Sequence, residues 1–326
     1  MLVRSPDRIA PAIEPLGVDA DIDHVVGDVT DPVSVSAALA DCDAVLHAAA
    51  VYNLDARSYR ETARTNVAGA ETVLRAAVER GCDPVVHVSS TAALLRRRAT
   101  VTPDSPLADA RTVYIRSKAD SEAVARRFQD DGAPVVIVQP GAVLGPHDPH
   151  LSDQMRRLRD ILRGLYPMWP SGGYHQVDVR DVASVHAAVM EPGRGPRRYL
   201  VPGRFLDGNT MFATIRGITG RRLPNIILPP WISLPVTRIA TQMQRITPFH
   251  IPLEYEGALI SAYATRYDDS RTREETGVQP RPLDETYADA IRWLHQRGWI
   301  SARQAGRAAT THSRSGEGDL RHDRPD

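Results

Sequence analysis

A tyrosine and the only lysine of the chain stand four residues apart, in the segment Tyr114-Ile-Arg-Ser-Lys118. On a helix this spacing places both side chains on one face, one turn apart. An ammonium group beside a phenol favours the phenolate and lowers the pKa of the tyrosine from its usual value of about 10. Tyr114 is therefore a candidate general acid or base at a carbonyl or alcohol oxygen. The alternative is a chance pair on a solvated helix face.

Three consecutive hydroxyl side chains precede this pair, in Ser89-Ser90-Thr91, directly after the apolar run that ends at Val88. At the end of a buried strand, Ser90 could donate a hydrogen bond to a substrate oxygen and hold that oxygen near Tyr114. The alternative is that the three hydroxyls only end the strand and begin a loop.

The elements that would position these residues alternate between short apolar runs and helical patterns over the first 145 residues. Continuous apolar runs predict buried strands, and apolar residues at helical spacing predict helices. This alternation predicts an α/β fold with a doubly wound parallel sheet and helices on both faces. The strands are expected at 24–27, 43–48, 84–88 and 133–138, and the helices at 31–39, 57–80 and 112–130.

After residue 145 the alternation breaks, and the composition predicts a second, smaller part. We expect a nucleotide-binding domain over 1–145, continued by 176–197, and a substrate-binding lobe over 146–175 and 198–300. The Pro-rich apolar stretch Leu223 to Pro252 could form the core and lid of this lobe, line an apolar pocket or rest on a membrane surface. Residues 301–326 contain few large apolar side chains and are predicted to be a disordered tail.

Composition limits the classes of protein. The 40 basic and 40 acidic residues cancel, which argues against nucleic-acid binding or membrane attachment through bulk charge. The two cysteines have no metal-ligand spacing and the histidines do not cluster, so no metal site is predicted. The start is not a signal peptide and no apolar run could span a bilayer. These features predict a cytoplasmic protein without stable membrane insertion that acts on a small molecule.

With these motifs the chain resembles the extended short-chain dehydrogenase/reductase superfamily, and more narrowly its dihydroflavonol-reductase-like and NAD-dependent epimerase/dehydratase members. The resemblance extends from about Leu2 to Gly298 and implies a Rossmann-like sheet. The matching segments are 27–31, 47–50, 65–69, the Ser90, Tyr114 and Lys118 set, 140–146, 177–182, and 269–271 with 283–288.

The resemblance implies catalytic roles for four residues. Tyr114 would give or take the hydroxyl proton, and Lys118 would lower its pKa and bind the nicotinamide ribose. Ser90 would orient the substrate oxygen, and Asn66 would support the proton path. The cofactor would exchange the hydride. Relatives often dimerise through the helices that correspond to 57–80 and 112–130, so a homodimer is expected.

The resemblance also implies a set of cofactor-binding residues. An acidic turn would bind the adenine, a small-residue loop would pass under the cofactor, and a Pro-Gly loop would line the nicotinamide. Besides Tyr114 and Lys118, these residues are Asp28, Val29, Ala48, Ala49, Ala50, Pro140 and Val143.

The chain departs from the family at its start. The family opens with a strand and a Gly-rich turn that binds the pyrophosphate at a helix N-terminus, but the first glycines here are scattered, at 17, 27, 69 and 81. Leu2 to Arg8 is similar to the second strand of the family and the turn after it. We therefore expect the first β-α unit, roughly 30 residues, to be missing, through a misassigned start or a truncated gene. A truncated sheet would fold poorly and bind cofactor weakly.

Arg4 falls at the end of that strand, where an arginine accommodates the 2′-phosphate of NADP. NADP(H) is therefore favoured over NAD(H), although Arg4 could simply be a solvated arginine. Ile115 follows the tyrosine where many sugar-nucleotide enzymes have glycine. We predict an NAD(P)-dependent reductase or dehydrogenase of a small, rather apolar ketone or secondary alcohol. The alternatives are a sugar-nucleotide epimerase or dehydratase, and a non-catalytic or truncated cofactor-binding member.

Overall fold

A four-stranded parallel sheet forms the centre of the computed structural model, which describes residues 1–309 apart from 20, 52–58, 110–111 and 244–254. Its strands run in the order β10 (Arg197–Leu200), β6 (Val135–Gln139), β4 (Val85–Val88) and β3 (Val45–His47). All five residues of β6 are buried, as expected for a parallel strand that is covered on both faces. The predicted α/β parallel sheet is confirmed.

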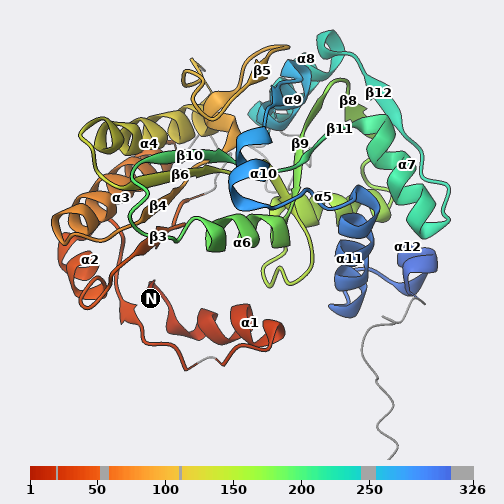
Figure 1. Ribbon diagram of the computed structural model, residues 1–326. Helices are drawn as coiled ribbons and strands as arrows, with labels where there is room; N and C mark the ends of the chain where they lie inside the picture. Colours follow the sequence, from red (N-terminus) through yellow and green to blue (C-terminus); the bar gives the residue numbers. More distant parts are fainter. Residues whose placement is uncertain (20, 52–58, 110–111, 244–254, 310–326) are drawn as a thin grey trace, which may run out of the picture.

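Alternate residues of the strands face opposite layers of helices. Val85, Val135 and Ile137 pack against α3 (Tyr59–Glu79) and α4 (Val113–Asp130). Val86 and Val136 pack on the other side, against α6 (Val179–Ala188). Figure 1 shows α3 and α4 side by side on one face of the sheet and α6 on the other.

A separate pair of strands precedes this sheet. β1 (Leu2–Val3) pairs with β2 (Val25–Val26), and among the described residues neither strand belongs to the sheet that ends at β3. The helix α2 (Pro32–Ala38), capped by Asp31 as predicted, contacts both of these strands. The short helix α1 (Ile9–Ile13) lies apart from the sheet (Figure 1).

This division corrects one expectation for the strand at 43–48. Val45 and His47 are buried, but Leu46 between them is 48% exposed. The strand is therefore covered on one face only, because β3 is the edge of its sheet and no described helix covers Leu46. The apolar pattern of a segment does not show whether helices cover both faces of the strand that it forms.

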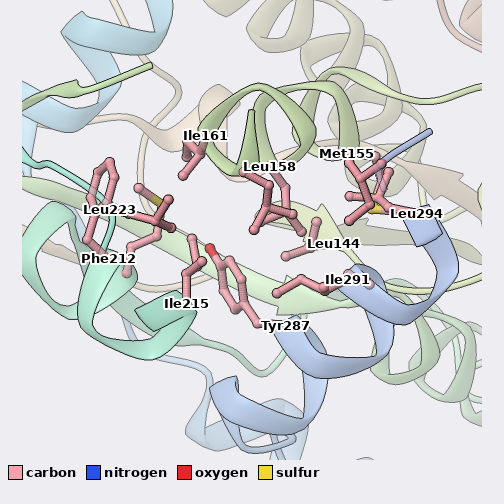
Figure 2. Close-up of a cluster of buried hydrophobic side chains, with 14 of the residues drawn as sticks. Leu144, Met155, Leu158, Ile161, Phe212, Ile215, Leu223, Tyr287, Ile291 and Leu294 are labelled. Carbon is pink, nitrogen blue, oxygen red and sulfur yellow. The ribbon is translucent and has the colours of Figure 1, made fainter. Parts of the chain in front are cut away.

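The C-terminal lobe is built on a three-stranded sheet, β11-β9-β7. β9 (Gly173–Asp178) runs parallel to β7 (Ala142–Leu144) and antiparallel to β11 (Arg204–Asp207). Three helices bury one apolar cluster against this sheet (Figure 2), namely α5 (Asp153–Leu162), α7 (Gly208–Thr219) and α11 (Leu283–Gln296). The remaining elements are β5 (Thr100–Val101), β8 (Met168–Pro170), β12 (Ile226–Leu228), α8 (Pro230–Met243), α9 (Tyr255–Tyr263), β13 (Arg266–Tyr267) and α10 (Ser270–Thr276).

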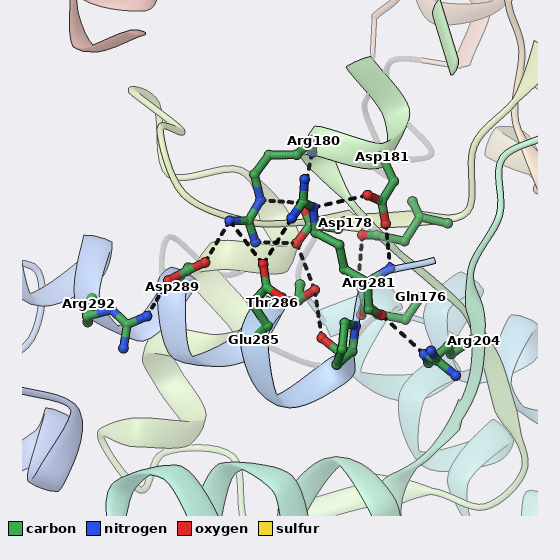
Figure 3. Close-up of polar contacts among 12 residues, drawn as sticks. Gln176, Asp178, Arg180, Asp181, Arg204, Arg281, Glu285, Thr286, Asp289 and Arg292 are labelled. Atoms are coloured by element: carbon green, nitrogen blue, oxygen red, sulfur yellow. Dashed lines mark hydrogen bonds and ion pairs between the residues drawn. The ribbon is translucent and has the colours of Figure 1, made fainter. Parts of the chain in front are cut away.

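A polar cluster joins α6 to α11 (Figure 3). Asp178 accepts hydrogen bonds from Thr286 Oγ1 and Arg180 Nη2, both at 2.7 Å, and Arg180 also reaches Asp289 at 2.7 Å. Burial by itself raises the pKa of Asp178, but these hydrogen bonds outweigh it and hold that pKa below its usual value. The motifs at 177–182 and 283–288 thus contact each other and connect the sheet to the lobe.

The prediction of disorder over 301–326 is wrong for its first part. A capping box between Ser301 and Gln304 begins the helix α12 (Ala302–Ala305), and a 3-10 turn follows over Gly306–Ala309. Ala305 and Ala308 are buried in the same cluster as α7 and α11. Small side chains are enough to hold this helix in place because they fill a space between α7 and α11. The average composition of the segment does not reveal such a space. Residues 310–326 lie outside the described residues.

Candidate active site

A cavity of about 660 Å³ opens at the carboxyl ends of β4 and β6. Ser90, Tyr114, Lys118, Pro140 and Val143 all line it, so the structure brings together five of the residues predicted from the sequence. Three segments supply them, namely the end of β4, the first turns of α4, and the loop after β6 together with β7. This is the edge where ligands bind in doubly wound sheets.

One face of α4 carries Tyr114 and Lys118 and continues, at the same spacing, with Glu122 and Arg126. Glu122 is fully buried. It accepts hydrogen bonds from Ser89 Oγ at 2.6 Å, Gln139 Nε2 at 2.8 Å and Arg126 Nη2 at 2.6 Å. This network ties α4 to the ends of β4 and β6 and thereby sets the position of Tyr114 relative to the serines.

The environment of Tyr114 differs from the expectation. Burial raises the pKa of Tyr114 to about 12, a hydrogen bond with Ser90 opposes this increase, and the charges of Glu256 and Asp153 add to it. The predicted lowering by Lys118 is not found. Burial also lowers the pKa of Lys118 to about 8, because removal from water disfavours the charged form of both groups. Tyr114 is therefore a proton-carrying phenol at neutral pH.

Asn66 lies behind α4 rather than in the cavity. Its Oδ1 accepts the backbone N–H of Val51 at 2.7 Å, and its Nδ2 donates to Val51 O and to Ser117 Oγ, both at 3.0 Å. Because Ser117 precedes Lys118, Asn66 fixes the segment after β3 against the turn of α4 that carries the lysine. A part in the proton path stays a prediction.

Two histidines that sequence reasoning did not select lie beneath this turn. His47 and His87 are buried at the ends of β3 and β4 and stack with ring centroids 5.6 Å apart. Burial and, to a smaller extent, the charge of Lys118 together lower the pKa of His47 to about 4. Neutral imidazoles can thus lie close to the lysine without repelling its ammonium form.

Glu256, from α9 of the lobe, also contacts the site. Its Oε1 accepts the backbone N–H of Tyr114 at 3.0 Å, whereas the N-cap residue Thr112 makes no side-chain capping bond. A carboxylate at this place satisfies one of the open N–H groups of α4 and favours its dipole. No sequence pattern could indicate a capping residue that lies 142 positions away.

The remaining predicted cofactor residues are not part of the cavity. Arg4 lines a separate hollow of about 560 Å³ beside β1 and α1. Asp28 accepts the N–H of Thr30 at 2.9 Å and its hydroxyl at 2.7 Å, and these bonds lower the pKa of Asp28. Val29 packs against the core beneath α3. Ala48, Ala49 and Ala50 are exposed directly after β3.

The positions of these residues determine which parts of a nicotinamide dinucleotide the described residues could hold. A redox-active ring and its ribose suit the cavity, because a buried ammonium, a phenol and a serine converge there. The exposed alanines leave room for a flat group beside β3. For the pyrophosphate, the described residues contain no Gly-rich turn at the start of a helix. The nicotinamide half therefore fits the residues described.

Comparisons with known proteins agree with this arrangement. Residues 8–201 match the model of the NAD-dependent epimerase/dehydratase family. The chain is 28% identical over 288 residues to sterol demethylase protein B of Methylococcus capsulatus, covering 86% of this chain and 87% of that protein. It is 28% identical over 292 residues, 86% of this chain and 83% of the other, to a Synechocystis sp. protein provisionally named a dihydroflavonol 4-reductase. The crystal structure of gox2253 superposes with a TM-score of 0.74 at 24% identity, covering 92% of this chain and 98% of that one. The chain belongs to the NAD-dependent epimerase/dehydratase family, within the extended short-chain dehydrogenase/reductase superfamily.

Proposed function

We propose that the chain is an NADP(H)-preferring reductase or dehydrogenase that interconverts a ketone and a secondary alcohol on a rather apolar molecule. The observation that carries this proposal is the convergence of Ser90, Tyr114 and Lys118 in one cavity whose other walls include many apolar side chains. Among these are Leu95, Met155 and Ile260. Such walls bind an apolar substrate and exclude water from the reacting centre.

In this mechanism Tyr114 gives its phenolic proton to the carbonyl oxygen during reduction and recovers it during oxidation. The pKa of about 12 keeps that proton on the oxygen until the developing alkoxide takes it. Ser90 donates a hydrogen bond to the same substrate oxygen, and Lys118 binds the ribose of the cofactor as an ammonium. The bound cofactor supplies or accepts the hydride.

Two further considerations support the choice of substrate and cofactor. The two relatives at 28% identity are named for a sterol and a dihydroflavonol, not for a sugar nucleotide. Arg4, directly after β1, is exposed, and an arginine at this position of the fold accommodates a 2′-phosphate. The rival function, sugar-nucleotide epimerisation or dehydration, has its support in the name of the family and in a dTDP-glucose 4,6-dehydratase of Streptomyces antibioticus, which is 31% identical over 40% of this chain. The other rival is a non-catalytic cofactor-binding protein, which fits the finding that the described residues contain no Gly-rich turn at the start of a helix.

The test is a fluorescence titration of the chain with NADPH and NADH, followed by absorbance assays of cofactor oxidation. These absorbance assays use bulky apolar ketones. UDP- and dTDP-sugars are assayed by chromatography of the sugar products, because epimerisation and dehydration return the hydride to the sugar and leave the cofactor unchanged. We expect tighter binding of NADPH and turnover of ketones only. Turnover of sugar nucleotides without turnover of any ketone would favour the epimerase or dehydratase. Failure of a folded chain to bind either cofactor would favour the non-catalytic alternative.

A further inference from the structure

The helix α8 exposes large apolar side chains and buries small ones, the opposite of the usual pattern for a surface helix. Its inward side carries the small residues Ser233, Thr237 and Ala240, which are buried. Its outward side carries Trp231, which is 75% exposed, and Ile239, which is 61% exposed. Trp231, Pro235, Ile239 and Met243 recur every four residues and so form one row along the helix, with the exposed Val236 beside it. We call these five residues the α8 stripe.

The charges around the α8 stripe are one-sided. No Asp or Glu occurs from 208 to 243, whereas the whole chain has 40 acidic residues in 326. The one charged residue of α8 itself is Arg238, which is exposed. The α8 stripe therefore has one basic side chain beside it and no acidic residue in its own helix, which complements an anionic, apolar boundary.

The α8 stripe is too small for a stable protein interface of its own. A helix of 14 residues is about 21 Å long and about 10 Å wide, so one side offers roughly 200 Å². A specific protein interface buries about 800 Å² on each partner. A lipid surface needs only one apolar helix face with a tryptophan at the level of the headgroups.

The α8 stripe also adjoins the active site. Val236 and Thr237 of α8 line a small hollow together with Gly257 and Ser261 of α9. Gly257 and Ser261 also line the large cavity that contains Tyr114. Figure 1 shows α8 at the outer rim of the lobe, beside α9. A surface on which α8 rests would therefore lie one helix away from the substrate cavity.

We propose that α8 is a monotopic docking helix, which rests on the surface of an anionic lipid bilayer through the α8 stripe. Trp231 and Ile239 enter the boundary between headgroups and acyl chains, and Arg238 pairs with lipid phosphate. None of the helices in the described part of the chain is long and apolar enough to cross a membrane, so the association is peripheral. Docking in this orientation turns the lobe side of the cavity toward the bilayer, from which an apolar molecule could enter.

The test is sedimentation of the full chain with vesicles of phosphatidylcholine alone and of phosphatidylcholine with about one third phosphatidylglycerol. We expect binding to the anionic vesicles and little binding to the neutral ones. Ile239→Glu should weaken binding roughly tenfold, because it replaces an inserted apolar group with a charge that the lipid repels. The matched control is Val33→Glu on α2, where the valine is 77% exposed and the same charge should change nothing.

Thermal unfolding establishes that each variant is folded, and Arg238→Glu provides a second variant that leaves the apolar row intact. Neither cofactor nor turnover is needed, so this test is independent of the proposed function. Equal binding of the wild type and both α8 variants, or equal binding of neutral and anionic vesicles, would overturn the proposal. So would a dimer in sedimentation velocity that Ile239→Glu dissociates, since a second copy of the chain would then cover the α8 stripe.

Discussion

The buried carboxylate of Glu122 provides a quantitative test of how the site is held together. It accepts hydrogen bonds from Ser89, Gln139 and Arg126, and the side chain of Arg126 is only 14% exposed. The Glu122→Gln variant keeps the size of the side chain but removes its charge. Breaking a buried ion pair costs about 3–5 kcal/mol. Arg126 keeps its bonds to two backbone carbonyls, so we expect a loss near the lower limit, about 3 kcal/mol.

For a chain of 326 residues such a loss lowers the Tm by roughly 4–5 °C. Because the network holds the segment of Ser89 and Ser90 against α4, we also expect kcat to fall about 10- to 100-fold while the cofactor Kd stays the same. Calorimetry and steady-state kinetics measure the two effects. The control is Glu191→Gln, which removes an exposed ion pair with Arg194 and should cost less than about 1 kcal/mol. If Glu122→Gln unfolds at the same temperature as this control, the buried network does not anchor the site.

Two further predictions follow from the walls of the site. A Cβ on Gly141 would lie 2.3 Å from the carbonyl oxygen of His175, whereas one on Gly217 would meet nothing within 4 Å. Gly141→Ala should therefore lower the free energy of unfolding by at least about 1–3 kcal/mol. Gly217→Ala in α7 should leave it unchanged or raise it, and equal unfolding temperatures of the two variants would contradict this reasoning. The pKa of Lys118 is about 8, so its ammonium is lost as the pH rises through that value. The Kd of the cofactor should be constant below pH 8 and increase by up to about tenfold per pH unit above it. A Kd that does not change with pH, or the same pH dependence in Lys118→Met, would rule out the ammonium as a cofactor ligand.

Local patterns predicted the elements that depend on neighbours in the sequence. The Asp31 cap, the long helices α3 and α4 and the buried strands β4 and β6 each follow from spacing within one segment. The meeting of Ser90 with Tyr114 could also be predicted, because parallel strands and their following helices end at one edge of the sheet.

Features that depend on distant partners could not be predicted. Glu122 has the sequence context of a solvated helical glutamate and is buried because Gln139 and Ser89 approach it. Glu256 reaches Tyr114 from another lobe. The pKa of Tyr114 was expected to fall because the charge of Lys118 was considered without the burial of both groups, and the burial dominates.

The central claim is that Tyr114 exchanges the proton at the substrate oxygen. The direct measurement compares NADPH oxidation by the wild type and by Tyr114→Phe with the same ketone, alongside NADPH titrations of both. The account predicts an unchanged cofactor Kd and a kcat that falls by about 10²- to 10⁴-fold, because the hydroxyl is the proton donor. A folded Tyr114→Phe variant with a kcat within a few-fold of the wild type would contradict it.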